Sequence, residues 1–296
     1  MIKTLTGIFA LSRPRQISKN LLVILPAIVS GEIFTWRNET SKYLELLTVL
    51  TCFITASIIV YIFNDILDFQ NDRKNPQRSN RPLISGKANK KSAVIYAFVL
   101  STTLSLLLIS SSISLVKLIF TYITINFFYS IKLKQIKYWE IIAVCSGYVL
   151  RALAGATIVD SSPSQGFYLF ILFFSVSIVA SKRMSELIAS TSIYRPVLSS
   201  YTKESLIAIY TISITISIYA YSSFIFSLSL NNESSFALNI TSVTSLLVLL
   251  IIFFEFTTIS FKGLAQSPED LLKSNRFIQA HVLLFVISTI SIGALR

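Results

Sequence analysis

Charged residues are scarce in this sequence. Only 14% of the 296 residues are Asp, Glu, Lys or Arg, and 53% are hydrophobic. A soluble domain usually has about a quarter of its residues charged. The deficit runs along the whole chain rather than being confined to one segment. It excludes an ordinary soluble protein and indicates an integral membrane protein that crosses the bilayer several times.

Cysteine and histidine are scarcer still. The two cysteines, Cys52 and Cys145, both fall within long apolar runs, where a cysteine usually packs as a small hydrophobic residue. His281 is the only histidine, so a site built from several histidines is excluded. We therefore expect neither a disulfide framework nor a multi-histidine metal centre.

The sequence also has no low-complexity linker and no Gly/Pro-rich hinge, and we expect residues 1–296 to form a single transmembrane domain. Its apolar runs are long enough to span, because about 20 apolar residues in a helix cross a hydrocarbon core of about 30 Å. They do not alternate as the strands of a membrane barrel do. The prediction is an all-α integral membrane protein with nine transmembrane helices, near residues 17–35, 46–64, 92–110, 113–130, 139–158, 165–183, 204–228, 237–258 and 278–295.

The basic residues gather at alternate ends of these predicted spans. The formal net charge of +12 could by itself suggest nucleic acid, but the cations cluster at 13–19, 73–91 and 132–137, whereas the loops at 110–114 and 161–165 carry no charge. Loops rich in Lys and Arg face the cytoplasm. This pattern predicts a cytoplasmic N-terminus and a location in the cytoplasmic (inner) membrane. It favours the lipid bilayer over nucleic acid as partner, and it places the active site at the cytoplasmic mouth of the bundle.

A polar stripe lies at the inner end of the second predicted span. Asn64, Asp68 and Asp72 recur every four residues, and Asp65 adjoins Asn64, so on an α-helix all four fall within an arc of about 100°. Three carboxylates on one face repel one another unless a cation lies between them. Mg²⁺ prefers carboxylate and amide oxygens and bridges to substrate phosphates. The stripe therefore predicts Mg²⁺ as cofactor, with these four residues as its ligands, a diphosphate substrate, and the three aspartates as catalytic residues.

Basic residues follow the stripe directly. Arg73, Lys74, Arg78 and Arg81 are suited to neutralise the remaining phosphate charge, and arginine offers a bidentate fork for phosphate oxygens. The alternative is that charges at this helix end are solvated and only fix the orientation of the chain. That alternative accounts for the cations. It accounts poorly for the acids, because carboxylates on a positive-inside face run against the trend.

The motif Asn64-Asp65-x-x-Asp68-x-x-x-Asp72 resembles the first aspartate-rich motif of the UbiA prenyltransferase superfamily. The resemblance extends over essentially the whole chain. It implies a membrane enzyme with nine transmembrane helices in a UbiA-like bundle, acting on polyprenyl substrates with Mg²⁺. Most members carry a second aspartate-rich motif after the fourth span, whereas residues 129–156 here contain a single acid, Glu140.

Further segments resemble the decaprenyl-phosphate phosphoribosyltransferase branch of that superfamily. They are Arg13-Pro14-Arg15-Gln16-x-x-Lys19-Asn20, Tyr129-Ser130-x-x-Leu133-Lys134, Gly147-x-x-x-Arg151-x-x-x-Gly155, Lys182-Arg183-x-x-Glu186 and Pro268-Glu269. This branch implies transfer of 5-phosphoribose from 5-phosphoribosyl diphosphate (PRPP) to a polyprenyl phosphate, with release of diphosphate. The substrate-binding residues we infer are the four basic residues above together with Arg13, Lys19, Asn20, Tyr129, Lys134, Glu140, Arg151, Lys182, Arg183 and Glu186.

Two of these assignments have structural alternatives. Arg151 lies about 18 Å into its predicted span, and an arginine so deep usually faces the bundle interior or a wet cavity. There it would bind a substrate phosphate or carboxylate, or form a structural ion pair. Lys182 and Glu186 are four residues apart, so a simple pair on a solvated helix end would also explain them.

Two other functions remain as alternatives. An ordinary UbiA-type enzyme would move a polyprenyl group from its diphosphate to an aromatic or other small acceptor, and the lack of a second acidic motif counts against it. A transporter would show paired broken helices in two related halves, whereas the acidic stripe occurs once. The sequence therefore favours a Mg²⁺-dependent membrane glycosyltransferase, and it leaves the oligomeric state open.

Overall fold

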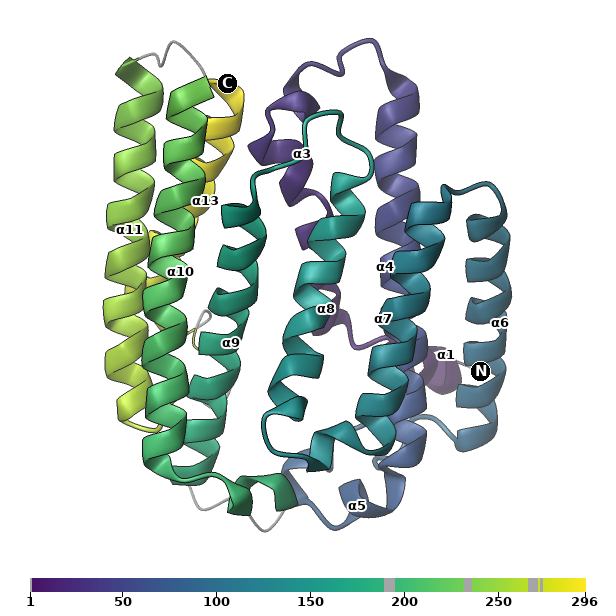
Figure 1. Cartoon of the computed structure of the whole chain (residues 1–296). Coiled ribbons are helices and arrows are strands. Elements are labelled where there is room, and N and C mark those ends of the chain that lie inside the picture. The colour runs from purple at the N-terminus through teal and green to yellow at the C-terminus, as the bar shows by residue number, and fades with distance from the viewer. Residues whose placement is uncertain (1, 189–194, 232–235, 266–270, 272–273) are drawn as a thin grey trace. The chain divides into compact units, whose positions relative to one another are not determined.

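The computed structural model (Figure 1) describes residues 2–188, 195–231, 236–265, 271 and 274–296. Every regular element in these residues is a helix. Within this part of the chain, eight helices are long and apolar enough to cross a membrane, which makes the protein a multi-pass membrane protein. They are α4 (Thr40–Leu67), α6 (Lys90–Ile109), α7 (Ile113–Ile131), α8 (Trp139–Ala156), α9 (Gln165–Ile188), α10 (Lys203–Asn231), α11 (Phe236–Phe261) and α13 (Arg276–Ala294). They correspond in order to the last eight predicted spans.

The prediction of one continuous helix over residues 17–35 is wrong. That segment is divided among α2 (Pro14–Ile17), η1 (Ser18–Val23), α3 (Leu25–Val29) and η2 (Glu32–Phe34). Pro26 has no N–H, and its ring obstructs a preceding helical turn, so α3 cannot continue the helix before it. Gly31 has φ of 81°, a left-handed conformation that ends a helix. The count of nine spans is therefore not confirmed in the described residues.

The contacts divide the chain into two compact units. Unit 1 comprises Met1–Ile24 and Ser41–Ile158, and unit 2 comprises Leu25–Thr40 and Val159–Arg296. The chain thus passes between the units at three places: inside the predicted first span, at the start of α4, and just after α8. Each unit contains four of the long helices and has its own packed interior.

In unit 1 the interior forms around α4. The N-terminal helix α1 (Ile2–Leu11) packs on α6, and its last residue, Leu11, is buried against Ile62 of α4 and Leu83 of the following loop. Helix α7 packs on α8. Tyr122 of α7 also reaches α4, where its ring centroid lies 5.5 Å from that of Phe53.

In unit 2 aromatic side chains fill the interior. Figure 1 shows α9, α10 and α11 side by side, with α10 packed on α9 and α13 packed on α11. The ring of Tyr221 lies 4.9 Å from that of Phe170 and 5.5 Å from that of Phe285, measured between centroids. The short helix α3 also packs on α13.

Large apolar side chains also cover the outer surface. Phe98 of α6, Phe120 of α7 and Phe254 of α11 are each more than 70% exposed. In water such a surface would aggregate, but in a bilayer it faces acyl chains that are as apolar as the side chains. The polar residues that are buried in the interior therefore need a separate explanation.

Candidate functional site

The predicted acidic stripe forms at the end of α4. Backbone hydrogen bonds join Asp68 N to Asn64 O at 2.9 Å and Asp72 N to Asp68 O at 2.8 Å. They preserve helical spacing even though α4 ends at Leu67 and the short helix α5 (Phe69–Arg73) begins after Asp68. All three carboxylates are buried, with 3% of Asp65, 8% of Asp68 and 1% of Asp72 exposed. Buried acids require compensation, and cations supply it.

Four basic residues pair with the three aspartates. Arg13 and Arg81 bind Asp65, Arg78 and Arg81 bind Asp72, and Lys134 binds Asp68. Arg81 bridges two of the acids, and its Nη1 lies 2.9 Å from Asp65 Oδ1. The cluster holds four formal positive charges against three negative ones, so it retains a positive excess toward an incoming anion. We refer to these seven residues as the acid–base cluster.

The cations of this cluster come from four separate segments. Arg13 lies between α1 and α2, and Lys134 lies on η4 (Leu133–Gln135), between α7 and α8. Arg78 ends η3 (Pro76–Arg78), and Arg81 follows in the loop toward α6. That loop turns back at Gly86, where φ is 73°. Its Leu83 is buried in the core of unit 1, which holds the basic loop against the end of α4.

Burial affects the electrostatics of Arg81. Loss of solvent and, to a lesser extent, the neighbouring charge of Arg13 hold the pKa of Arg81 below its ordinary value, while Asp65 and Asp72 act in the opposite direction. Both lowering effects disfavour a charge in a confined cationic setting. A bound polyanion would relieve the repulsion between Arg81 and Arg13.

Two acceptor atoms of the stripe lack a hydrogen-bond partner. Asn64 Oδ1 and Asp65 Oδ2 are both buried, and no donor reaches either. A buried acceptor without a donor is costly, and an amide oxygen beside a carboxylate oxygen is the donor set that Mg²⁺ accepts. In the described residues, no three His, Cys, Asp or Glu side chains converge on one point that could hold a metal. The donor chemistry therefore fits Mg²⁺ at Asn64 and Asp65, while Asp68 and Asp72 are engaged with cations.

Other predicted residues of unit 1 lie near the cluster to different degrees. Arg73 and Lys74 are exposed, and Tyr129 is half-buried. Glu140 is fully buried in the first turn of α8. Lys19 lies with its Nζ 5.9 Å from the centre of the Tyr148 ring. In the described residues, neither Arg73 nor Lys74 forms an ion pair with an aspartate of the stripe.

A second polar group lies deeper in unit 1, around Arg151. This side chain is 4% exposed. Its Nε donates to Asn20 Oδ1 at 2.7 Å, and its Nη1 donates to the backbone oxygen of Gly147 at 2.7 Å. Its Nη2 donates to Ser57 Oγ and to the Tyr122 hydroxyl, each at 2.9 Å. The structure thus joins Arg151 and Asn20, and it adds Ser57 and Tyr122, which the sequence analysis did not single out.

The remaining predicted residues lie in unit 2. Arg183 is 3% exposed, and its Nη1 donates to Glu186 Oε2 at 2.9 Å. Arg195 also binds this oxygen, at 3.2 Å, and the sequence analysis did not assign it a role. Lys182 is half-buried on the same helix, α9. Glu186 thus binds two arginines, and a pair between Lys182 and Glu186, the structural alternative given above, stays a prediction. Pro268 and Glu269 lie outside the described residues.

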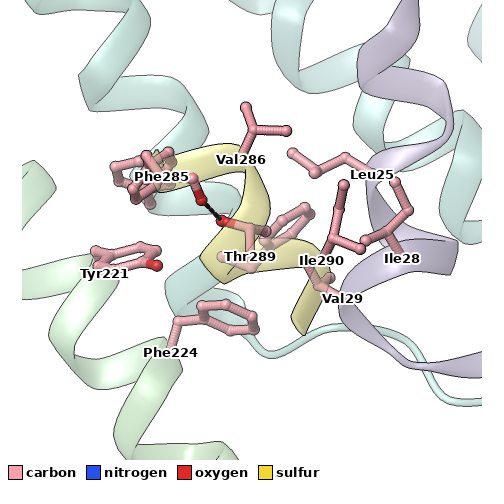
Figure 2. Close-up of a pocket in the computed structure, with 11 residues that line it drawn as sticks. Leu25, Ile28, Val29, Tyr221, Phe224, Phe285, Val286, Thr289 and Ile290 are labelled. Carbon is pink, nitrogen blue, oxygen red and sulfur yellow. Dashed lines mark hydrogen bonds between the residues drawn. The ribbon is translucent and has the colours of Figure 1, made fainter. Parts of the chain in front are cut away.

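Unit 2 also contains an apolar cavity of about 190 Å³. Figure 2 shows Leu25 and Ile28 of α3 on one side and Tyr221 and Phe224 of α10 on the other. Its polar groups are already bonded: the Tyr221 hydroxyl donates to Ser245, and Thr289 Oγ1 donates to the backbone of its own helix. The cavity suits hydrocarbon rather than phosphate, and none of the predicted site residues lines it.

Comparison with solved structures supports the fold. The chain matches a structure of digeranylgeranylglyceryl phosphate synthase with a TM-score of 0.71 at 17% identity, covering 99% of both chains. It also matches a UbiA homologue from Archaeoglobus fulgidus, bound to GPP and Mg²⁺, with a TM-score of 0.65 at 12% identity, covering 97% of this chain and 98% of that one. At these identities the likeness concerns the helical fold alone.

Comparison of sequences goes further. A decaprenyl-phosphate phosphoribosyltransferase of Mycobacterium tuberculosis is 29% identical over 288 residues, which cover 95% of this chain and 92% of that protein. The model of the UbiA prenyltransferase family matches residues 23–266, a range that includes the whole acidic stripe and Arg151. The chain therefore belongs to the UbiA prenyltransferase family.

Proposed function

We propose that this protein transfers 5-phosphoribose from PRPP to a polyprenyl phosphate and releases diphosphate. The name of the M. tuberculosis relative, similar over nearly the full length of both chains, supports a phosphoribosyl donor. The single acid between residues 129 and 156 supports it as well, because a prenyl diphosphate donor in this family is expected to need a second acidic motif. The observation that carries the proposal is the acid–base cluster together with the two unpartnered oxygens of the stripe, on Asn64 and Asp65.

In this proposal Asn64, Asp65, Asp68 and Asp72 hold Mg²⁺ together with the diphosphate of PRPP. Bound Mg²⁺ would neutralise charge that accumulates on the diphosphate leaving group. Arg13, Arg78, Arg81 and Lys134, which pair with the aspartates in this structure, would turn to the phosphate oxygens. Arginine forms two parallel hydrogen bonds with such groups. The exposed Arg73 and Lys74 extend this positive surface outward.

The chemical step needs positioning more than proton transfer. The lipid phosphate is already ionised, so its oxygen can attack the anomeric carbon without a general base. As the bond from that carbon to the diphosphate breaks, the electron pair leaves with the diphosphate and the sugar becomes oxocarbenium-like. Fixed cations at the leaving group favour this transition state over the ground state. Holding two anionic substrates together against their repulsion is the contribution of the remaining basic residues.

We further propose that the whole chain acts as one UbiA-like domain in the cytoplasmic membrane. Its N-terminus and its acid–base cluster would face the cytoplasm, where PRPP, a soluble substrate, is available. The distribution of Lys and Arg supports this orientation. Lys182, Arg183 and Glu186 of unit 2 are also proposed to bind substrate.

Product analysis tests the proposal. Membranes or purified protein receive Mg²⁺, labelled PRPP and decaprenyl phosphate, and mass spectrometry follows the lipid. We expect a ribose-5-phosphate adduct on the lipid with the wild type, and a loss of at least about 100-fold in rate with Asp68→Asn, because charge stabilisation of this kind is commonly worth that much. Glu39→Gln, an exposed change outside the cluster, should retain the wild-type rate.

The alternative is transfer of a prenyl group from its diphosphate to an aromatic or other small acceptor. The A. fulgidus structure bound to GPP and Mg²⁺ is the observation in its favour. The same preparations therefore also receive a prenyl diphosphate with an aromatic acid. Product only in that assay would overturn the phosphoribosyl proposal, and an undiminished Asp68→Asn would show that the stripe is not the metal site.

A further inference from the structure

Arg151 has an uncompensated charge in the interior of unit 1. All four of its hydrogen-bond acceptors are neutral: an amide, a backbone carbonyl and two hydroxyls. Among the described residues no carboxylate pairs with it. A buried guanidinium without an anion is costly, and an arginine in a transmembrane helix usually marks a functional site. The group is therefore arranged as if to receive an anion.

The surroundings of Arg151 suit a phosphate. The residue before Asn20 is Lys19, a second cation. Tyr61 follows Ser57 by four residues on α4, and the Arg13 guanidinium carbon lies 5.2 Å from the centre of its ring. The hydroxyls of Ser57 and Tyr122 accept from the Arg151 guanidinium, and Ser57 Oγ in turn donates to Asn20 Oδ1 at 3.1 Å, a hydrogen bond that it would exchange for one to a phosphate oxygen. Guanidinium, ammonium and hydroxyl groups are all donors to phosphate oxygens.

Helix α4 connects this group to the acidic stripe. Ser57, Tyr61 and Asp65 are spaced four residues apart, so they lie along one side of the helix, one turn from the next. Ser57 is about 12 Å from Asp65 along the helix axis. Two anions bound at the two ends of this interval would repel each other less than two adjacent anions. Tyr61 lies between Ser57 and Asp65 on the helix, so a ribose bound beside Tyr61 would lie between the two anions.

Gly147 makes the arrangement of Arg151 possible. A Cβ at this position would come within 3.2 Å of Arg151 Nη1 and 3.4 Å of Tyr122 Cε2. The glycine lets the guanidinium lie close against its own helix and bond the Gly147 carbonyl. The guanidinium of Arg151 is thus held in one orientation, and the second hydrogen of Nη1 can donate to a ligand.

We propose that Arg151, Lys19, Ser57 and Tyr122 bind the phosphate of the acceptor lipid, separately from the diphosphate of the donor. This assignment rests on the proposed function for the identity of the acceptor. A lipid-borne phosphate suits a site within the span of α8, since the attached isoprenoid chain remains in apolar surroundings. The aspartates that would hold the metal lie at the C-terminal end of α4, about two turns beyond Ser57. The two substrates would therefore bind to different groups of basic residues.

A binding experiment tests the site without turnover. Purified protein in detergent, without Mg²⁺ or PRPP, is titrated with decaprenyl phosphate, with decaprenol and with inorganic phosphate, and binding is followed by thermal shift and native mass spectrometry. We expect decaprenyl phosphate to bind much more tightly than either control compound. Arg151→Lys should weaken that binding about tenfold, since it keeps a cation but loses the fork. Tyr122→Phe and Ser57→Ala should weaken it less, and they leave the buried charge in place.

Steady-state kinetics separate this site from the donor site. Arg151→Lys and Tyr122→Phe should raise KM for decaprenyl phosphate while leaving KM for PRPP within about twofold, and Asp68→Asn should impair PRPP binding without changing lipid binding. Equal changes in both KM values, or unchanged lipid binding in all three variants of the Arg151 group, would mean that Arg151 is only structural. Lipid binding that depends on Arg151 in a protein that does not turn over PRPP would contradict PRPP as the donor and would still support the phosphate site at Arg151.

Discussion

At the scale of single residues, Arg81 connects two acids that would otherwise act independently. It binds both Asp65 and Asp72, whereas Arg13, Arg78 and Lys134 each bind one aspartate. In the proposed function its guanidinium would therefore contact a diphosphate that spans the stripe. Burial first, and then the charge of Arg13, lower the pKa of Arg81, so a bound anion would favour its charged form.

Arg81→Gln should therefore impair PRPP use more than it impairs folding. We expect KM for PRPP to rise about tenfold or more, because a charge-assisted pair to each acid is lost while Arg13 and Arg78 still compensate those acids. Lys91→Gln removes the same charge at an exposed position and serves as the matched control. Equal KM values in the two variants, measured at one ionic strength, would contradict the role of Arg81.

The acids could be predicted from sequence because their four-residue spacing is local to one helix. The partners of Arg151 could not. Ser57 and Tyr122 lie in different helices from Arg151, and neither is unusual in an apolar helix, where serine and tyrosine commonly occur. Arg195 was missed for the same reason: its link to Glu186 spans nine residues, and Arg195 lies beyond the last residue of α9, Ile188. Such contacts depend on packing between elements, which a single sequence does not reveal.

At the scale of elements, the last eight spans were predictable from length and hydropathy, but the first was not. Pro26 and Gly31 lie inside a run that is apolar enough to span, and hydropathy does not register the hydrogen bonds that these residues remove or redirect. The resulting short helix α3 packs against α13. The contact is so close that a Cβ on Gly293 would lie 1.9 Å from the backbone oxygen of Ile28.

Gly293→Ala should thus force α3 and α13 apart. Because the obstructing atom is backbone, we expect a loss of about 1–3 kcal/mol in the free energy of unfolding, as is usual for overpacking. Thermal unfolding in detergent measures it. Ala294→Ser, the exposed neighbour, is the control, and a melting temperature unchanged in both variants would show that the helices tolerate the methyl group.

At the scale of the whole molecule, the family follows from its sequence and fold, and the domain organisation stays a prediction. The chain was expected to form one domain, and its contacts divide it into two compact units. Neither the family nor the domain organisation determines substrate specificity. We propose that it depends on a few residues, such as the acids and Arg151, whose ligands are inferred from chemistry rather than from the architecture they share with other family members.

Metal and donor should bind as a pair. Four cations already pair with the three aspartates. A lone Mg²⁺ that binds Asp68 and Asp72 as well as Asn64 and Asp65 must therefore displace arginine or lysine, whereas Mg²⁺ with PRPP supplies anions for the displaced groups. We expect Mg²⁺ alone to leave the melting temperature nearly unchanged and Mg²⁺ with PRPP to raise it by several degrees. At a PRPP concentration of 100 times its Kd, binding adds about 3 kcal/mol to the free energy of unfolding. EDTA should abolish both the shift and turnover. Full activity in EDTA would exclude the metal.

The backbone of Arg13 links the site to the N-terminus of the chain. Its φ of 46° is a left-handed conformation that costs a non-glycine residue about 1–2 kcal/mol, and its ion pair with Asp65 helps to hold it there. If Mg²⁺ takes the place of Arg13 on Asp65, as proposed above, this restraint on the junction between α1 and α2 is lost. Metal binding would then change the orientation of the first helix, a consequence that extends the effect of one ion pair to the start of the chain.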